Sequence, residues 1–156
     1  MIAFSLSRLE KENIRLEGTE PPEFILLASG DTFNVSSVVS YALDVSKVSG
    51  GALVSGEVAT EISGECGRCL APVLRKITTG EFRFFVETPP GMEVCDISDE
   101  VRTEITLALP MNLLCREDCR GLCPECGADL NREKCSCRPK SSRGSGVWDA
   151  LDGLKL

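Results

Sequence analysis

The sequence predicts an α+β fold: a β-rich antiparallel body with one main helix and a C-terminal cysteine-rich zinc-binding module. Three observations predict this fold. β-Branched residues interleave with polar ones over residues 35–62, as in antiparallel strands. One helical pattern ends at Pro110, and six of the nine cysteines crowd into the turn-rich residues 115–137. The body is expected to cover residues 1–110, the module 111–140, and a linker with a short apolar C-terminal segment 141–156.

The first part of the body is expected to hold short strands. Residues 2–6 alternate apolar and polar side chains, which predicts a half-buried opening strand before a charged stretch at residues 8–15. Pro21 and Pro22 predict a turn or extended elbow because consecutive prolines exclude helix there, and a short apolar run follows at residues 24–27.

Longer strands are expected next. Residues 35–48 and 52–62 form two strands, joined at Gly50-Gly51, where each glycine can take the positive φ that a hairpin turn needs. The strand pattern resumes at residues 73–86. The sequence Cys66-Gly-Arg-Cys69 therefore falls at a turn between strands, where Gly67 is expected to let the backbone fold tightly.

One helix is expected at the end of the body. Asp96 or Ser98 is placed to cap it, and acidic residues follow in the first turn, where the helix dipole favours them. Val101, Ile105 and Leu109 recur every fourth residue on one face. The apolar residues of the C-terminal segment are Val147, Trp148, Leu151 and Leu154.

The expected cellular compartment helps to decide whether the cysteines form disulfides or bind metal. No apolar run approaches the roughly 20 residues of a membrane span, and the first residues lack the basic end and long apolar region of a secretory signal. A cytoplasmic protein without membrane contact is expected. Because thiols stay reduced there, metal binding explains the nine cysteines better than disulfides do.

Two zinc sites account for eight of the cysteines. Cys123-Pro-Glu-Cys126-Gly127 has the form of a zinc knuckle, and Cys135-Ser-Cys137 can close its tetrahedron after an eight-residue loop. Cys115 with Cys119, and Cys66 with Cys69, are the remaining pairs, and Cys95 is left over. A single site using Cys119, Cys123, Cys126 and either Cys135 or Cys137 also satisfies the spacing, so one or two zinc ions are expected. Iron–sulfur clusters are the main rival, but neither familiar ferredoxin spacing occurs.

Charge is distributed unevenly along the chain. Residues 1–110 hold 9 Lys and Arg against 17 Asp and Glu, a net charge of −8, whereas residues 111–145 hold 7 against 5, a net charge of +2. The basic side chains of the module are either a solvated face or a site for RNA phosphate or a protein partner. The candidates are Arg116, Arg120, Arg132, Lys134, Arg138 and Lys140, with Arg143 beyond them.

The sequence gives little support for a catalytic function. The chain has no histidine, no G-x-S-x-G motif and no Walker-type glycine loop, and its carboxylates are spread rather than paired. A four-cysteine zinc site also leaves no open coordination position. We therefore expect that the protein is not an enzyme and has no small-molecule substrate. The alternative is a thiol-based redox or metal-handling protein that uses its C-x-x-C pairs.

The cysteine motifs carry a family resemblance. The stretch Gly64-Glu-Cys66-Gly-Arg-Cys69-Leu70, the helix end Leu107-Ala-Leu-Pro110, and the stretch from Cys119 to Asn131 followed by Cys135-Ser-Cys137 resemble the large ribosomal RNA subunit accumulation proteins, the YceD-like family. The likeness runs from about Gly51 to the C-terminus. Where members of that family often carry an Asp-Pro-Arg tail motif, this chain has Ser142-Arg-Gly144.

The resemblance implies a function. It suggests a non-enzymatic cytoplasmic factor that supports accumulation of large-subunit ribosomal RNA and assembly of the 50S subunit. The partner would be ribosomal RNA or a ribosomal protein of the large subunit. The acidic body makes a basic ribosomal protein a serious candidate.

Overall fold

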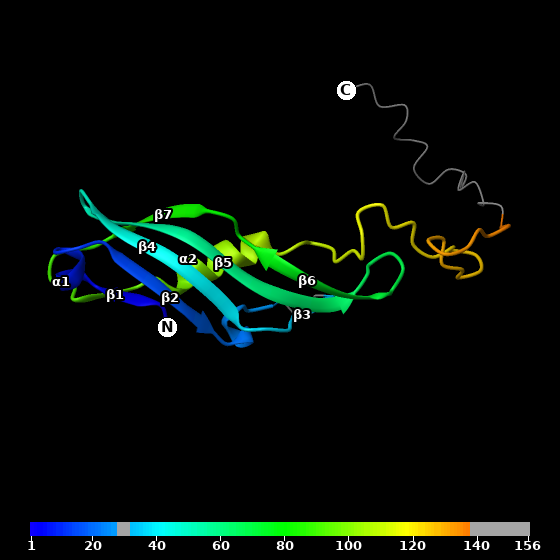
Figure 1. The fold of residues 1–156 in the computed structure, drawn as a ribbon, viewed down its shortest axis with the longest axis horizontal. Helices are drawn as coiled ribbons and strands as arrows, with labels where there is room; N and C mark the ends of the chain where they lie inside the picture. The colour runs from blue at the N-terminus through cyan, green and yellow to red at the C-terminus, as the bar shows by residue number, and fades with distance from the viewer. Residues whose placement is uncertain (28–31, 138–156) are drawn as a thin grey trace, which may run out of the picture.

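The computed structural model describes residues 1–27 and 32–137. Figure 1 shows an elongated molecule in which a twisted antiparallel sheet has one helix lying along one face. Residues 111–137, which we call the cysteine segment, continue from the end of that helix and extend beyond one end of the sheet. The predicted fold class, an antiparallel β-rich body with one main helix, is confirmed.

The secondary structure is mostly strand. The strands are β1 (Ala3–Ser5), β2 (Ile14–Glu20), β3 (Phe33–Val35), β4 (Val39–Val48), β5 (Gly51–Glu65), β6 (Pro72–Thr78), β7 (Phe82–Glu87) and β8 (Val94–Asp96). The helices are α1 (Leu6–Leu9), the 3-10 turn η1 (Pro22–Phe24) and α2 (Ser98–Ala108). Within residues 1–27 and 32–137, no helix is long and apolar enough to cross a membrane.

The sheet is built around β5. β4 and β3 pair with one edge of β5, β6 and β7 pair with the other, and β2 pairs with the far side of β4, all antiparallel. β5 runs from Gly51 to the residue before Cys66. The hairpin turn before it is Ser49-Gly50 and not the predicted Gly50-Gly51, because Gly51 already pairs with Val48, and Gly50, with φ 85°, takes the positive φ without Gly51. One end of this central strand therefore places a candidate ligand at the end of the sheet.

The predicted strand over residues 73–86 is two strands, β6 and β7. Both pair with β5, but the register shifts by one residue between Thr60↔Ile77 and Gly56↔Phe82. At this point the Thr79 N–H donates to the Val58 carbonyl at 3.0 Å, and Thr79 Oγ1 accepts from the Val58 N–H at 3.0 Å. The extra residue is a β-bulge, which increases the local bend and twist of the paired strands.

The core lies between α2 and one face of the sheet. Alternate residues of β5, including Val54, Val58 and Ile62, are fully buried, and α2 packs against β5 and β6 with Val101 and Ile105. Each such aliphatic side chain contributes about 1.5–3 kcal/mol through burial. The intervening β5 residues are more exposed, so the opposite face of the sheet faces solvent.

Strand β2 in the N-terminal region was not predicted from the sequence. Ile14 and Leu16 alternate with Arg15 and Glu17 in β2, within and just beyond residues that looked like a charged stretch. The expectation that the prolines exclude a helix is wrong in detail. Pro22 is the first residue of the turn η1, a position where its missing N–H group is not needed.

The predicted start of α2 is close to the observed one, but the N-cap residue is Ile97, which makes no side-chain capping bond, and not Asp96 or Ser98. Asp96 Oδ1 accepts hydrogen bonds from the Ser98 N–H at 2.9 Å and from Ser98 Oγ at 2.6 Å. Ser98 Oγ in turn accepts from the Ile2 N–H at 2.8 Å, which connects the residue before β1 to the helix. The helix ends at Ala108, two residues before Pro110, and leads directly into the cysteine segment.

Gly64, in the motif that precedes Cys66, is required for space. A Cβ at Gly64 would lie 2.5 Å from the Thr32 carbonyl oxygen and 2.9 Å from Phe33 Cα. We expect Gly64→Ala to lower the free energy of unfolding by about 1–3 kcal/mol because β3 must move. Gly67→Ala is the matched control, since its Cβ would meet only the Leu113 carbonyl oxygen at 3.7 Å. Guanidinium unfolding measures both, and equal destabilisation by the two variants would contradict the expectation.

Candidate metal centres

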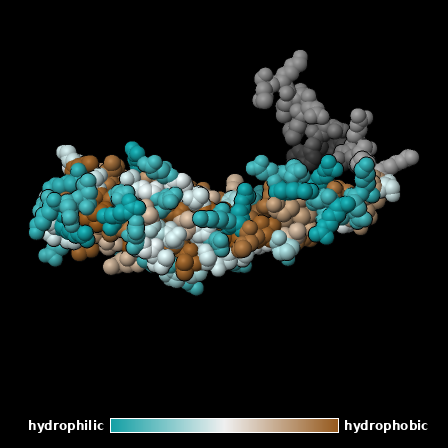
Figure 2. Space-filling view, in the orientation of Figure 1, coloured by the Kyte–Doolittle hydropathy of each residue, from teal (hydrophilic) through white to brown (hydrophobic). Residues whose placement is uncertain are grey.

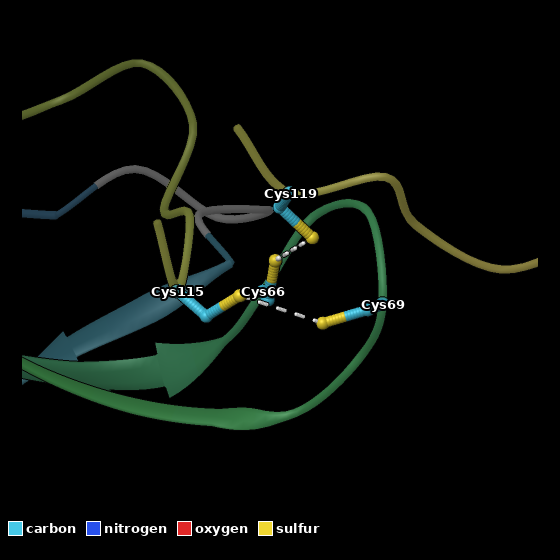
Figure 3. A group of neighbouring side chains, drawn as sticks. All are labelled: Cys66, Cys69, Cys115 and Cys119. Carbon is cyan, nitrogen blue, oxygen red and sulfur yellow. Dashed lines mark hydrogen bonds between the residues drawn. The ribbon is translucent and has the colours of Figure 1, made fainter. Parts of the chain in front are cut away.

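The first cysteine group joins two distant parts of the chain. Cys66 and Cys69 lie in the turn between β5 and β6, and Cys115 and Cys119 lie after α2. Figure 3 shows the four side chains pointing toward one another. All four Sγ atoms lie within 4.8 Å of one another, with Cys66 and Cys119 at 3.8 Å and Cys69 and Cys115 at 3.6 Å. A tetrahedron of Zn–S bonds of about 2.3 Å places its sulfurs about 3.8 Å apart, so the spacing suits zinc.

The turn at residues 66–70 is folded to direct N–H groups at sulfur. The N–H groups of Arg68 and Cys69 hydrogen-bond to Cys66 Sγ, and the Leu70 N–H donates to the Cys66 carbonyl at 2.9 Å. Burial opposes ionisation of Cys66, but these N–H groups and that of Cys115 outweigh it and lower the pKa of its thiol to about 6. The residue of this turn with a left-handed backbone is Leu70, with φ 59°, whereas Gly67, which was expected to let the backbone fold tightly, has no positive φ.

Backbone contacts dock the cysteine segment onto this turn. The Gly67 N–H donates to the Leu113 carbonyl at 2.8 Å, and the Leu122 N–H donates to the Arg68 carbonyl at 3.1 Å. The Arg68 guanidinium donates to the carbonyls of Cys119 at 2.8 Å and Glu117 at 3.2 Å. These bonds hold the four thiols in place from both sides of the group.

Gly121 permits the close approach of the two segments. Its φ is +73°, and a Cβ there would lie 2.9 Å from the Arg68 carbonyl oxygen. Both the left-handed conformation and the short distance favour glycine. Leu113, fully buried, anchors the same segment in the core of the body.

The second cysteine group is local in sequence. The Sγ atoms of Cys123, Cys126, Cys135 and Cys137 all lie within 4.8 Å of one another, and those of Cys123 and Cys135 are 3.3 Å apart. The Gly127 N–H donates to the Cys123 carbonyl at 2.9 Å, with Gly127 at φ +74°. The N–H groups of Cys126 and Glu125 lower the pKa of Cys123 to about 7. This turn therefore repeats the arrangement around Cys66.

Each group also contains thiols that hold their protons more tightly. Burial and the neighbouring thiols of Cys119 and Cys69 raise the pKa of Cys115 to about 12. Hydrogen bonds with the thiols of Cys126 and Cys135 raise the pKa of Cys137 to about 12. Crowded thiols disfavour several negative charges at one place, and a cation at the centre removes this obstacle. The donor set, the sulfur spacing and the N–H groups directed at sulfur all fit a four-thiolate metal ion.

The remaining thiol lies apart from both groups. Cys95 is in β8, where it pairs with Phe4 of β1 and is 4% exposed. Burial raises the pKa of its thiol, and it joins neither group. The single site that would combine Cys119 with Cys123 and Cys126 is not the arrangement found, because the Cys119 sulfur belongs to the first group.

The candidate contact residues are not equivalent. The Arg116 guanidinium donates to Asn131 Oδ1 at 2.8 Å and lies 3.4 Å from Asp118, and Arg132 lies 3.4 Å from Asp129. Arg120 and Lys134 are exposed, and neither takes part in an ion pair among the described residues. Arg138, Lys140 and Arg143 lie outside the described residues, as does the apolar C-terminal segment. Figure 2 shows hydrophilic residues gathered over the cysteine segment on one face.

Asn131, which was not among the predicted site residues, contacts the first cysteine group. Its Nδ2 donates to Cys119 Sγ at 3.4 Å and to Asp129 Oδ1 at 2.8 Å. The signal available was its place in the loop between Cys126 and Cys135, but a loop position does not reveal contact with the other cysteine group.

Comparison with known proteins supports the family resemblance. The family model "Large ribosomal RNA subunit accumulation protein YceD" matches residues 85–155, a range that includes every cysteine except Cys66 and Cys69. An uncharacterized protein of Mycobacterium tuberculosis is 38% identical over 105 residues, covering 58% of this chain and 51% of the relative. The chain thus spans about half the length of that relative.

Two plant proteins match a shorter region. The large ribosomal RNA subunit accumulation protein YCED homolog 1, chloroplastic, of Arabidopsis thaliana is 37% identical over 59 residues, 37% of this chain and 18% of the plant protein. Its namesake in Zea mays is 37% identical over 57 residues, 36% of this chain and 20% of the plant protein. No solved structure matches the chain. Over residues 85–155 the chain is therefore similar to the large ribosomal RNA subunit accumulation protein family, YceD, as its cysteine motifs indicated.

Proposed function

We propose that this protein is a non-enzymatic cytoplasmic factor that supports accumulation of large-subunit ribosomal RNA and assembly of the 50S subunit. It acts by binding ribosomal RNA or a ribosomal protein of the large subunit. The observation that carries the proposal is the family match over residues 85–155, a range that includes the whole cysteine segment. The plant relatives are named for large ribosomal RNA subunit accumulation.

The two cysteine groups are proposed to bind one zinc ion each. Four thiolates complete a tetrahedral zinc site and leave no position for a substrate, so the role of the metal is structural. The first ion fastens the cysteine segment to the β5–β6 turn, and the second closes residues 123–137 on themselves. We propose that the body ends at residue 110 and that the cysteine-rich module covers residues 111–140.

Proton release tests this metal proposal. Each group contains two thiols whose pKa lies above the ordinary value of 9.0, Cys69 and Cys115 in the first and Cys135 and Cys137 in the second. These thiols are protonated at pH 7, and zinc must displace their protons to bind. We expect each ion to release at least two protons, so zinc affinity should fall by about 100-fold or more per unit decrease in pH near 7. Calorimetry in buffers of different ionisation enthalpy measures the number, and no proton release would contradict thiolate binding.

The proposed contact surface is the basic side of the module. It consists of Arg116, Arg120, Arg132 and Lys134, with Arg138 and Lys140 added from the sequence. Arg120 and Lys134 are the best probes because their charges are not used in ion pairs within the described part of the chain.

A salt titration distinguishes RNA from protein as the partner. Each phosphate contact contributes about 0.7–0.9 to the slope of log affinity against log salt. We expect Arg120→Glu with Lys134→Glu to reduce that slope for binding to large-subunit RNA fragments by about 1.5. Arg83→Glu, an exposed charge reversal on β7 of the body, is the control and should leave the slope unchanged. An affinity that does not change with salt would move the contact from RNA to a protein, and a steep slope that neither variant changes would contradict the choice of Arg120 and Lys134 as contact residues.

Depletion of the protein tests the cellular function. We expect the ratio of large-subunit to small-subunit ribosomal RNA to fall, and to recover when the wild-type chain is supplied. A Cys66→Ser chain should fail to restore the ratio, whereas Cys95→Ala, which keeps both cysteine groups, should restore it. An unchanged ratio after depletion would overturn the proposed function.

A further inference from the structure

We propose that Asn131 couples the two cysteine groups, so that a metal ion in the second group strengthens metal binding by the first. The inference rests on the proposed metal binding. Asn131 belongs to the loop between Cys126 and Cys135, which are both members of the second group. Its side chain nevertheless contacts the first group, because Nδ2 donates a hydrogen bond to Cys119 Sγ at 3.4 Å.

The same amide also holds the backbone beside Cys119. Asn131 Oδ1 accepts from the Arg120 N–H at 2.8 Å and from the Arg116 guanidinium at 2.8 Å. One side chain therefore orients a candidate ligand and the residue that follows it. An N–H group that donates to a metal-bound thiolate lowers the charge on sulfur and fixes its direction, and loss of such partners typically weakens metal binding about 10- to 100-fold.

The position of Asn131 depends on closure of its loop. The Leu130 N–H donates to the Gly121 carbonyl at 3.0 Å, and Leu122 bridges to Asp129. Asp129 Oδ1 accepts from both the N–H and Nδ2 of Asn131, at 2.9 and 2.8 Å. When Cys126 and Cys135 bind one ion, the two ends of this loop are held together and the amide stays at Cys119. Loss of that ion frees the loop ends and lets the donor leave.

Thermodynamic linkage makes this coupling reciprocal and measurable. If an ion in the second group raises the affinity of the first, an ion in the first raises the affinity of the second by the same factor. The coupling should pass through the Asn131 amide, since it is the side chain of this loop that contacts a sulfur of the first group.

The test uses zinc affinity measured by competition with a chromophoric chelator, and Co²⁺ absorption to count four-thiolate sites. Cys135→Ser with Cys137→Ser removes the second group, and we expect it to weaken the first site at least about 5-fold. Asn131→Asp keeps the oxygen that accepts from Arg116 and Arg120 but loses the donor, and should weaken the first site about 10- to 100-fold. In the Asn131→Asp chain, removal of the second group should have no further effect on the first.

Two controls separate the donor from other effects. Asn131→Asp places a carboxylate beside Asp129, so it is also measured with Asp129→Asn, which restores a hydrogen bond between these two positions but not to Cys119. Asn34→Ala, an exposed substitution in β3, should leave both affinities unchanged.

Three results would overturn the inference. The Asp129→Asn, Asn131→Asp chain could bind zinc at the first site as tightly as the wild type, which would remove the role of the donor. The wild-type first site could keep its affinity without the second group, which would remove the coupling. A wild-type chain without any bound zinc would overturn the metal proposal itself, and this inference with it.

Discussion

Cys66→Ser is expected to empty the first cysteine group while the second keeps its ion. The lost binding free energy is on the order of 10 kcal/mol, because a structural zinc site forms only with its complete set of thiolates. Without that ion the cysteine segment should separate from the β5–β6 turn. The amides of Gly67 and Leu122, which donate to Leu113 and Arg68 across this junction, should then lose protection from hydrogen exchange.

Cys95→Ala is the matched control for this experiment. It also removes a buried thiol, but from β8 and outside both groups. We expect a cost of about 1 kcal/mol from the small cavity, with both ions retained and both amides protected. Loss of both ions in Cys66→Ser, or full protection of Gly67 and Leu122, would contradict the assignment of Cys66 to a separate first site.

Ile105→Ala is expected to destabilise the body by about 2–5 kcal/mol. Ile105 is fully buried on α2, the helix that packs against β5 and β6. Since β5 and β6 carry the turn with Cys66 and Cys69, partial unfolding of the body should weaken the first metal site. The second group should keep its ion, because all four of its thiols lie within residues 123–137.

Leu107→Ala controls for the change in helix composition. Leu107 lies on the same helix but is 75% exposed, so the substitution should change the free energy of unfolding by no more than about 0.5 kcal/mol. Guanidinium unfolding followed by circular dichroism, together with metal content per chain, measures both variants. Release of the second ion from Ile105→Ala would show that the module depends on the body more than its local ligands imply.

The sequence predicted the elements whose side-chain patterns are undisturbed. The alternation along β5 and the apolar face of α2 both follow from periodicity that one face of the core imposes. The hairpin before β5 was expected, but its turn lies one residue earlier than predicted, at Ser49-Gly50. β2 was missed because arginine and glutamate occupy its solvent face and resemble a charged loop. The bulge at Thr79 was missed because its position depends on pairing with Val58 and not on a local pattern.

The two cysteine groups differ in how far sequence could describe them. All four cysteines of the second group lie within residues 123–137, and their zinc-knuckle spacing can be recognised directly in the sequence. For the first group, the spacing of the cysteines left two pairs, 66/69 and 115/119, without assigned partners. Contact between Cys66 and Cys119 requires β5, α2 and Leu113 to be in place, and no local spacing shows this. Asn131 illustrates the same limit, since its partner Cys119 belongs to a group built by tertiary structure.

The docked arrangement also indicates why a metal would matter in this segment. The buried side chains of the cysteine segment are Leu113, Cys119 and Cys123 within the described residues, so apolar burial contributes little there. The hydrogen bonds from Gly67, Arg68 and Leu122 set the geometry, but each contributes only about 1 kcal/mol. A bound ion in each group is the strongest stabilising term that these residues offer.

Metal content of the intact chain under native mass spectrometry tests the central claim most directly. We predict two zinc ions per chain, all nine cysteines unmodified, and one ion remaining in each of Cys66→Ser and Cys123→Ser. A chain without metal that carries a reversible Cys66–Cys69 disulfide would contradict the claim and favour a redox function. A single ion lost in both variants together would contradict the existence of two sites.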